Sequence, residues 1–399
     1  MTTVKAKAAI AARLALGLLP DRLSLPLRPA ERRFDLAEVP APIEAPEGDV
    51  RLLVAPANFA GQGHLWARAA ERLEGVGAMN MQVASEDGFG FAADYEVPRA
   101  VFDSSGSWAR RQRRAVGSDF THVLVEAERS MFGLALQGFV EREIAWLRDR
   151  GVRTGMVSHG TDLRSPHRHA EIDRWSPFRD ADPEWVNGLE RRAARNRAIF
   201  ERSGLPAFVA TPELLEDWPA AQWLPNVVDP DRWENQEAVL TTDRPVVLHA
   251  PTNPAVKGTA LIEPALEKLT SEGIIDYQRI LRIPSAEMPG RFAAADIVLD
   301  QFALGIYSTT SIEAMAAGRL VFAHLHSQVR DHIVAVTGLE PPIVEATPDS
   351  LEDLLRDVRE RPEYYRSIAR RGPAYVRSVH DGALSARVLA PFLGRELPQ

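Results

Sequence analysis

Two runs of alternating strand and helix patterns constrain the fold of this chain most. The first run has apolar strand patterns at residues 51–55, 79–83, 121–125 and 153–158, with helix patterns at 65–73 and 132–148. The second run has strand patterns at 245–250, 275–283, 296–299 and 319–323, with helix patterns at 258–269, 286–295 and 308–317. Strands that alternate with helices form parallel sheets. The chain is therefore predicted to be an α/β protein with two Rossmann-like domains.

The division between the domains is expected where both periods break down. Pro225, Pro230 and a run of polar residues interrupt the pattern between residues 224 and 242. A chain of 399 residues also exceeds the usual size of one hydrophobic core. We predict a basic extension and linker at 1–48, an amino-terminal Rossmann-like domain at 49–235 and a carboxy-terminal Rossmann-like domain at 236–380. A last helix, 381–399, is expected to return to the first domain.

The composition excludes several kinds of chemistry. The chain has no cysteine, so disulfides, thiolate metal sites and cysteine nucleophiles are impossible. This permits an intracellular location, and we expect a cytoplasmic protein. The net charge of -8 argues against binding to nucleic acid, which requires many positive charges.

The amino-terminal segment differs in charge from the rest. Residues 1–34 carry seven Lys or Arg residues and only two acidic ones, Asp21 and Glu31. Residues 4–19 are able to form an amphipathic helix, either on an anionic membrane at the inner face of the cell membrane or against their own domain. No apolar stretch reaches the length of about 18 residues that a membrane span needs, and no secretory signal is expected.

The second run contains a recognisable motif. AADIVLDQ at residues 294–301 is followed by SIEAMAAG at 311–318. Together they resemble the donor-site signature of retaining GT-B glycosyltransferases of the sucrose-synthase-like and mannosyltransferase-like group. WLPNVVD at 223–229 resembles the interdomain segment of that group, and Lys257-Gly258 resembles its KG pair at a helix start.

This resemblance implies an activity and a fold. It implies two Rossmann-like domains that face each other across a cleft, and the transfer of a sugar from a nucleotide-sugar with retention of configuration. The acceptor would be a glycan, a lipid-linked sugar or a small molecule, and no metal cofactor is expected. The chain departs from the pattern twice. Gly305 stands where the group has its first glutamate, and the arginine that usually precedes the lysine is absent.

The predicted donor site lies around two helix starts in the second domain. Lys257 and the first amides of the following helix are expected to stabilise the departing diphosphate. Ser308 and Thr309 start the next helix, where they bind phosphate or simply cap the helix. Glu313 is expected to accept the ribose hydroxyls, and the alternative is a carboxylate that only complements the helix dipole. The remaining candidates for contact with the donor are Asn226, Gly305 and Tyr307.

The first half supplies the other candidates. Gly61 and Gly63 follow the first strand and would let the backbone approach a phosphate. A dinucleotide fingerprint is rejected because Trp66 takes the place of its third glycine. His159 follows a strand and matches a histidine that contacts the donor sugar in the group, although a lone histidine is also a common structural residue.

Asp162 and Arg164 are weaker candidates for acceptor binding, with a loop ion pair as the alternative. His167 and His169 lack a third ligand nearby in sequence, so no metal site is predicted. No paired carboxylates indicate a double displacement, and the departing phosphate is expected to take the acceptor proton. Two other functions stay open, a non-catalytic partner or scaffold with this fold and a GT-B sugar epimerase.

Overall fold

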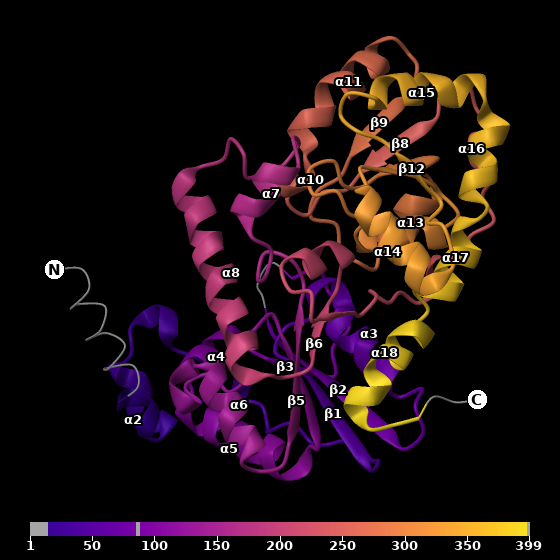
Figure 1. The fold of residues 1–399 in the computed structure, drawn as a ribbon. Helices are drawn as coiled ribbons and strands as arrows, with labels where there is room; N and C mark the ends of the chain where they lie inside the picture. The colour runs from indigo at the N-terminus through magenta and orange to yellow at the C-terminus, as the bar shows by residue number, and fades with distance from the viewer. Residues whose placement is uncertain (1–14, 85–87, 397–399) are drawn as a thin grey trace. The chain divides into compact units, whose positions relative to one another are not determined.

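The computed structural model describes residues 15–84 and 88–396 (Figure 1). Contacts divide the chain into two compact units. The first unit comprises Met1–Ser158, Ala198–Phe208 and Leu389–Gln399, and the second comprises His159–Arg197 and Val209–Val388. The last residues therefore group with the first unit, as the chain returns to it. The predicted boundary between residues 235 and 236 falls within the second unit.

The first sheet has seven strands in the order β3-β2-β1-β4-β5-β6-β7. Its strands are β1 (Val50–Ala55), β2 (Val76–Val83), β3 (Tyr95–Val97), β4 (His122–Glu126), β5 (Arg153–Ser158), β6 (Ala207–Val209) and β7 (Gln222–Trp223). The pairs that β1 makes with β2 and β4 are parallel. Leu52, Leu53 and Val54 are fully buried. A continuous apolar run of this kind is typical of a parallel strand that is covered on both faces.

Helices connect these strands. They are α3 (Gln62–Ala70), α4 (Arg99–Ser104), α5 (Gly106–Asp119) and α6 (Val140–Arg148). The helix expected over residues 132–148 is shorter, because Leu136, Gln137 and Gly138 have positive φ angles that no α-helix tolerates. The chain reaches α6 only after this turn.

The second sheet has five strands in the order β12-β11-β10-β8-β9. They are β8 (Val246–His249), β9 (Asp276–Arg279), β10 (Ile297–Leu299), β11 (Leu320–Ala323) and β12 (Ile343–Glu345). All the pairs are parallel. Ile297 and Leu299 belong to one apolar cluster, whereas Val298 belongs to another. Neighbouring residues of β10 thus point into two cores, one on each face of the sheet.

The second unit contains helices before, between and after these strands. They are α7 (Pro166–Ile172), α8 (Pro183–Ser203), α9 (Pro230–Trp233), α10 (Pro254–Lys257), α11 (Thr259–Ser271), α12 (Met288–Ala293), α13 (Thr309–Ala316), α14 (Ser327–Thr337), α15 (Leu351–Glu360), α16 (Pro362–Ala369) and α17 (Gly372–Val379), with α8 continuing into the first unit. The final helix, α18 (Ala383–Leu393), also spans the two units. The prediction of an α/β protein with two Rossmann-like sheets is confirmed.

One short helix was not predicted. Pro254–Lys257 form the helix α10, between the strand expected at 245–250 and the helix expected at 258–269. The Asn253 side chain accepts hydrogen bonds from the amides of Ala255 and Val256, and Pro254 occupies the first helical position. This cap starts a helix that Gly258 ends four residues later with a φ of 76°.

The start of the chain packs on the first unit where it is described. The Asp21 carboxylate accepts a hydrogen bond of 2.5 Å from Ser105 Oγ. The helix α2 (Asp21–Ser24) and three short 3-10 turns follow one another up to Glu38. Most of the predicted amphipathic helix over 4–19 lies outside the described residues. Within the described part of the chain, no helix is long and apolar enough to cross a membrane.

Candidate functional site

A buried carboxylate organises the carboxyl end of the second sheet. Asp300 directly follows β10, and its side chain accepts hydrogen bonds from Ser308 N at 2.7 Å, Ser308 Oγ at 2.8 Å and Ser311 Oγ at 2.6 Å. It also forms an ion pair with Lys257. Asp300 thereby fastens the amino end of α13 to the end of β10. Parallel sheets bind ligands beyond this edge, so the position suits a binding site.

Lys257 has a compensated charge in this structure. Its ammonium contacts the Asp300 carboxylate and donates a hydrogen bond of 2.7 Å to Ser308 Oγ. Burial alone would raise the pKa of Asp300, but the Lys257 ammonium and the hydrogen bonds from the Ser311 hydroxyl and the Ser308 amide hold this pKa below its usual value. Only 8% of the Lys257 side chain is exposed, so it is not a solvated surface lysine.

Glu313 lies one turn further along α13 and is part-buried. Burial raises the pKa of its carboxyl group to about 8, although the positive charges of Arg232 and Lys257 oppose the rise. A group with this pKa is largely protonated near neutral pH. A ligand that donates hydrogen bonds to Glu313 would stabilise its ionised form and lower its pKa.

Asp300 and Arg232 were not assigned a role from the sequence. Arg232 lies in α9, where it donates a hydrogen bond of 2.5 Å to the Ser285 carbonyl and stacks over Trp233. It supplies a positive charge near Glu313 in a chain that lacks the arginine usual before the lysine. Asp300 could have been identified as a candidate from the sequence, since it is a charged residue directly after a buried strand.

The amino end of α13 is capped by its own residue. Ser308 Oγ accepts a hydrogen bond of 3.2 Å from the Thr310 amide, as the capping alternative expected. Thr309 Oγ1 lies 3.5 Å from Asn226 Nδ2, so two predicted donor-binding residues are neighbours. Their contact with a donor remains a prediction.

Position 305 has no room for a side chain. Gly305 has a φ of +63°, and a Cβ atom there would lie 2.4 Å from the His326 ring. The His326 amide also donates a hydrogen bond of 2.9 Å to the Gly305 carbonyl. His326 thus occupies the space that the glutamate of the resembling group would enter. The absence of a glutamate at position 305 therefore has a steric cause.

Tyr307 points into the core of its unit. Its hydroxyl lies 2.9 Å from His380 Nε2 and 3.1 Å from the Tyr375 hydroxyl. His380 Nδ1 is 2.7 Å from the Asn226 carbonyl, and burial lowers the pKa of His380 to about 4. The neutral imidazole donates to Asn226 and accepts from Tyr307. This network supports the loop that contains Asn226.

The two glycines of the first unit have different reasons to be glycine. Gly61 starts α3 with a φ of +75°. Gly63 lies inside the first turn, where an added Cβ would come within 2.5 Å of Asn80 Nδ2 and 2.8 Å of Glu126 Oε2. Protein groups already fill the space beside Gly63. Close packing within the unit accounts for this glycine, whereas the predicted phosphate contact stays untested.

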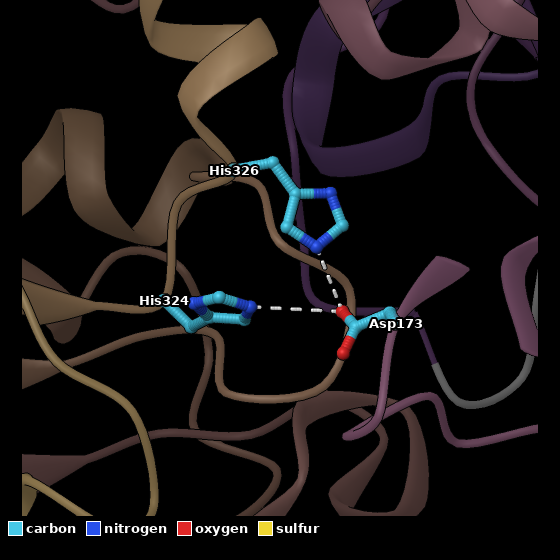
Figure 2. Close-up of side chains that lie close together, drawn as sticks. All are labelled: Asp173, His324 and His326. Atoms are coloured by element: carbon cyan, nitrogen blue, oxygen red, sulfur yellow. Dashed lines mark hydrogen bonds and ion pairs between the residues drawn. The ribbon is translucent and has the colours of Figure 1, made fainter.

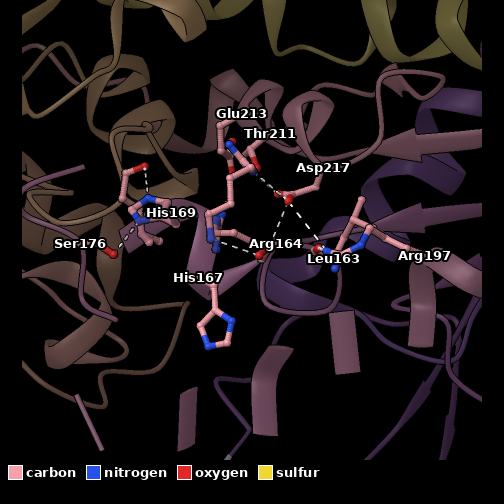
Figure 3. A network of polar contacts seen from close by, with 12 residues as sticks. Leu163, Arg164, His167, His169, Ser176, Arg197, Thr211, Glu213 and Asp217 are labelled. Atoms are coloured by element: carbon pink, nitrogen blue, oxygen red, sulfur yellow. Dashed lines mark hydrogen bonds and ion pairs between the residues drawn. The ribbon is translucent and has the colours of Figure 1, made fainter. Parts of the chain in front are cut away.

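The loop after β5 is held by internal contacts (Figure 3). The Asp162 carboxylate accepts hydrogen bonds from the amides of His159 at 2.8 Å and Gly160 at 2.6 Å. Arg164 forms a buried ion pair with Glu213. Asp162 and Arg164 therefore stabilise the loop, although they do not pair with each other, and the loop places His159 at the end of the strand. Their contact with an acceptor stays a prediction.

His167 and His169 do not converge (Figure 3). His169 Nδ1 is 2.8 Å from Ser176 Oγ, and burial lowers the pKa of His169 to about 4. His167 is exposed and lies 3.9 Å from Glu190. The two rings thus have separate surroundings.

No protein-family model matches this chain, and no curated protein matches it in sequence. Solved structures do match it. Sucrose-phosphate synthase from Thermosynechococcus elongatus has a TM-score of 0.54 at 14% identity, over 85% of this chain and 97% of that one. HepE from Anabaena in complex with UDP and glucose has a TM-score of 0.55 at 12% identity, over 86% and 98% of the two chains. The same protein in complex with UDP-glucose gives 0.52 at 11% identity, over 86% and 98%. With its two parallel sheets, this chain has the GT-B fold.

Proposed function

We propose that this chain is a glycosyltransferase that moves a sugar from a nucleotide-sugar to a glycan, a lipid-linked sugar or a small molecule, with retention of configuration. The observation that carries the proposal is the arrangement of Lys257, Asp300 and Ser308 at the end of β10. It presents the start of α13 beyond the carboxyl edge of a parallel sheet, where ligands of such sheets bind. The likeness in fold to HepE, solved with UDP-glucose, agrees with this assignment.

The side chains have distinct roles in this proposal. The cations of Lys257 and Arg232 and the first amides of α13 would stabilise the charge that develops on the departing diphosphate. Glu313 would accept hydrogen bonds from the ribose. Because protein cations supply the positive charge, we expect the transfer itself to need no metal. His159 would contact the sugar, and Gly61 would let the backbone approach a phosphate.

A thermal-shift screen tests the donor site. Purified protein is heated with UDP, GDP, ADP, CDP or dTDP in buffer that contains EDTA. A nucleotide at 100 times its dissociation constant stabilises the folded protein by about 2.7 kcal/mol. We expect one nucleotide to raise the melting temperature and Glu313→Ala to abolish the rise. Glu363→Ala, which alters an exposed glutamate of α16, is the control and should keep it.

A non-catalytic partner is the second candidate, and two observations favour it. The charge of Lys257 is already compensated by Asp300, and His326 fills the space beside Gly305. This candidate predicts no nucleotide-dependent stabilisation and no sugar transfer from any nucleotide-sugar. A screen without a single responding nucleotide would therefore favour it over the glycosyltransferase.

The described part of the amino-terminal segment supports contact with an anionic membrane. Leu18, Leu23 and Leu27 are 78%, 62% and 65% exposed, and the exposed Arg22 lies among them. Exposed leucines next to basic side chains suit the interface of an anionic bilayer. We expect co-sedimentation with vesicles that contain phosphatidylglycerol but not with pure phosphatidylcholine. Replacing the three leucines by serine should abolish it. Unchanged sedimentation of that variant would refute the proposal.

A further inference from the structure

Two histidines and an aspartate converge in the second unit (Figure 2). His324 and His326 follow β11, and Asp173 follows α7. His326 Nε2 lies 2.9 Å from Asp173 Oδ2, and His324 Nε2 lies 3.7 Å from the same oxygen. The three candidate ligand atoms all lie within 4.8 Å of one another. One carboxylate oxygen thus faces the outer nitrogens of two imidazole rings.

These distances suit a tetrahedral metal ion. Bonds of about 2.0–2.1 Å from zinc to nitrogen or oxygen place neighbouring ligand atoms about 3.3 Å apart. The two separations from Asp173 Oδ2 lie on either side of that value. Small rotations of the two rings would bring all three atoms to bonding distance of one ion.

The groups behind the ligands fix their orientation. His324 Nδ1 lies 2.8 Å from Glu345 Oε1, and the other oxygen of Glu345 accepts a hydrogen bond of 2.8 Å from the Leu325 amide. Asp173 Oδ1 accepts a hydrogen bond of 2.7 Å from the Trp175 amide, which leaves Oδ2 to face the histidines. A carboxylate behind a histidine is the usual support of a metal-binding imidazole.

A simple ion pair explains less of this arrangement. At 3.7 Å, His324 Nε2 is beyond hydrogen-bonding distance of Asp173, yet Glu345 holds its ring in that direction. The Asp173 side chain is only 1% exposed, so its carboxylate faces the histidines rather than solvent. The absence of a side chain at Gly305 gives the His326 ring its place.

We propose that Asp173, His324 and His326 bind a divalent transition-metal ion that favours imidazole ligands, such as Zn²⁺, with water in the fourth position. The ion would join the segment after α7 to the turn after β11, two segments about 150 residues apart in sequence. This inference does not depend on the proposed transfer reaction.

Cobalt is the probe for this site. Untagged protein, freed of metal by chelation, is titrated with Co²⁺ at mildly alkaline pH, because imidazole must be deprotonated to bind a metal. We expect one equivalent to bind with the visible absorption of four- or five-coordinate cobalt, and Zn²⁺ to displace it. Zn²⁺ should also raise the melting temperature of the wild type.

Three variants of the site and one control decide whether the ion binds at these residues. Asp173→Asn and His326→Ala should abolish the cobalt absorption, whereas His167→Ala, an exposed histidine of the same unit, should keep it. Glu345→Gln keeps all three ligands and should weaken binding about 10- to 100-fold, so it remains informative if the other variants fail to fold. Folded wild-type protein without the cobalt absorption would overturn the proposal, as would absorption unchanged in all three ligand-shell variants.

Discussion

Lys257 and Asp300 form a buried ion pair in which Ser308 bonds to both partners. The pair links the end of α10, the end of β10 and the start of α13. Charges buried in this way stabilise a protein only while both partners are present. The same contacts therefore determine the stability of the second unit and the proposed donor site.

Removing one charge of this pair should be more harmful than removing both. Asp300→Asn leaves the Lys257 ammonium buried without compensation, and we expect it to lower the free energy of unfolding by about 3–5 kcal/mol. The double variant Lys257→Met/Asp300→Asn should recover much of that loss but not nucleotide binding. Urea denaturation measures the first effect and the nucleotide screen the second. An Asp300→Asn variant as stable as the wild type would show that the ion pair does not contribute to the stability of the fold.

A side chain at position 305 should conflict with His326. Gly305→Ala places a Cβ atom 2.4 Å from the imidazole ring in a backbone conformation with φ +63°. We expect a loss of about 1–3 kcal/mol in stability. In a His326→Ala background the clash disappears and only the backbone strain remains, so the same change should be less harmful. Equal losses in both backgrounds, measured by denaturation, would contradict this account of Gly305.

The stability of the second unit should depend on pH through Glu313. Its pKa is about 8 in the folded protein against 4.5 for the free group, so folding takes up a proton between these values. The stabilising contribution is fully present below about pH 4.5 and is lost as the pH rises to about 8.

Glu313→Gln cannot lose this contribution, because its side chain stays neutral. The free energy of unfolding of the variant, relative to that of the wild type, should therefore increase by about 1–3 kcal/mol from pH 5 to pH 8 and change little above pH 8. Melting temperatures of both proteins across this range measure the difference. A constant difference at every pH would rule out titration of Glu313 as the cause.

Gly63 should tolerate no side chain. Gly63→Ala would crowd Asn80, Glu126 and the Ala57 carbonyl, and we expect it to destabilise the first unit by about 1–3 kcal/mol. Gly290→Ala is the matched control, since a Cβ atom there meets nothing within 4 Å and the residue lies in helix α12. This control should be neutral or slightly stabilising. Thermal unfolding of both variants makes the comparison.

Local patterns of the sequence predicted most of the fold. Strand β5 begins and ends at the predicted residues. Four of the five strands of the second sheet, β8 to β11, were predicted within a few residues, because short strand patterns between turns and helix patterns indicate buried strands without tertiary information. Strand β12 (Ile343–Glu345) was not predicted. The helix α10 was missed because its signal is a cap, Asn253 followed by Pro254, rather than a periodic pattern.

The site was less predictable, since its contacts join distant parts of the chain. The Lys257-Gly258 pair indicated Lys257 and the predicted helix start indicated Ser308, but nothing local pairs either of them with Asp300. Asp173 lies some 150 residues from His324 and His326, and no periodicity connects them. Even the missing glutamate at Gly305 became intelligible only through the position of the His326 ring.

The alternation of side chains between the two faces of the sheet fixes the number of residues in β10. Ile297 and Leu299 fill one core and Val298 fills the other, and Asp300 comes next. Adding or deleting one residue in this strand would exchange the faces of every side chain that follows. The Asp300 carboxylate, which binds Lys257 and the start of α13, would then point into the apolar core. Natural variants of this chain should therefore change length in loops and conserve the number of residues between Asp296 and Asp300.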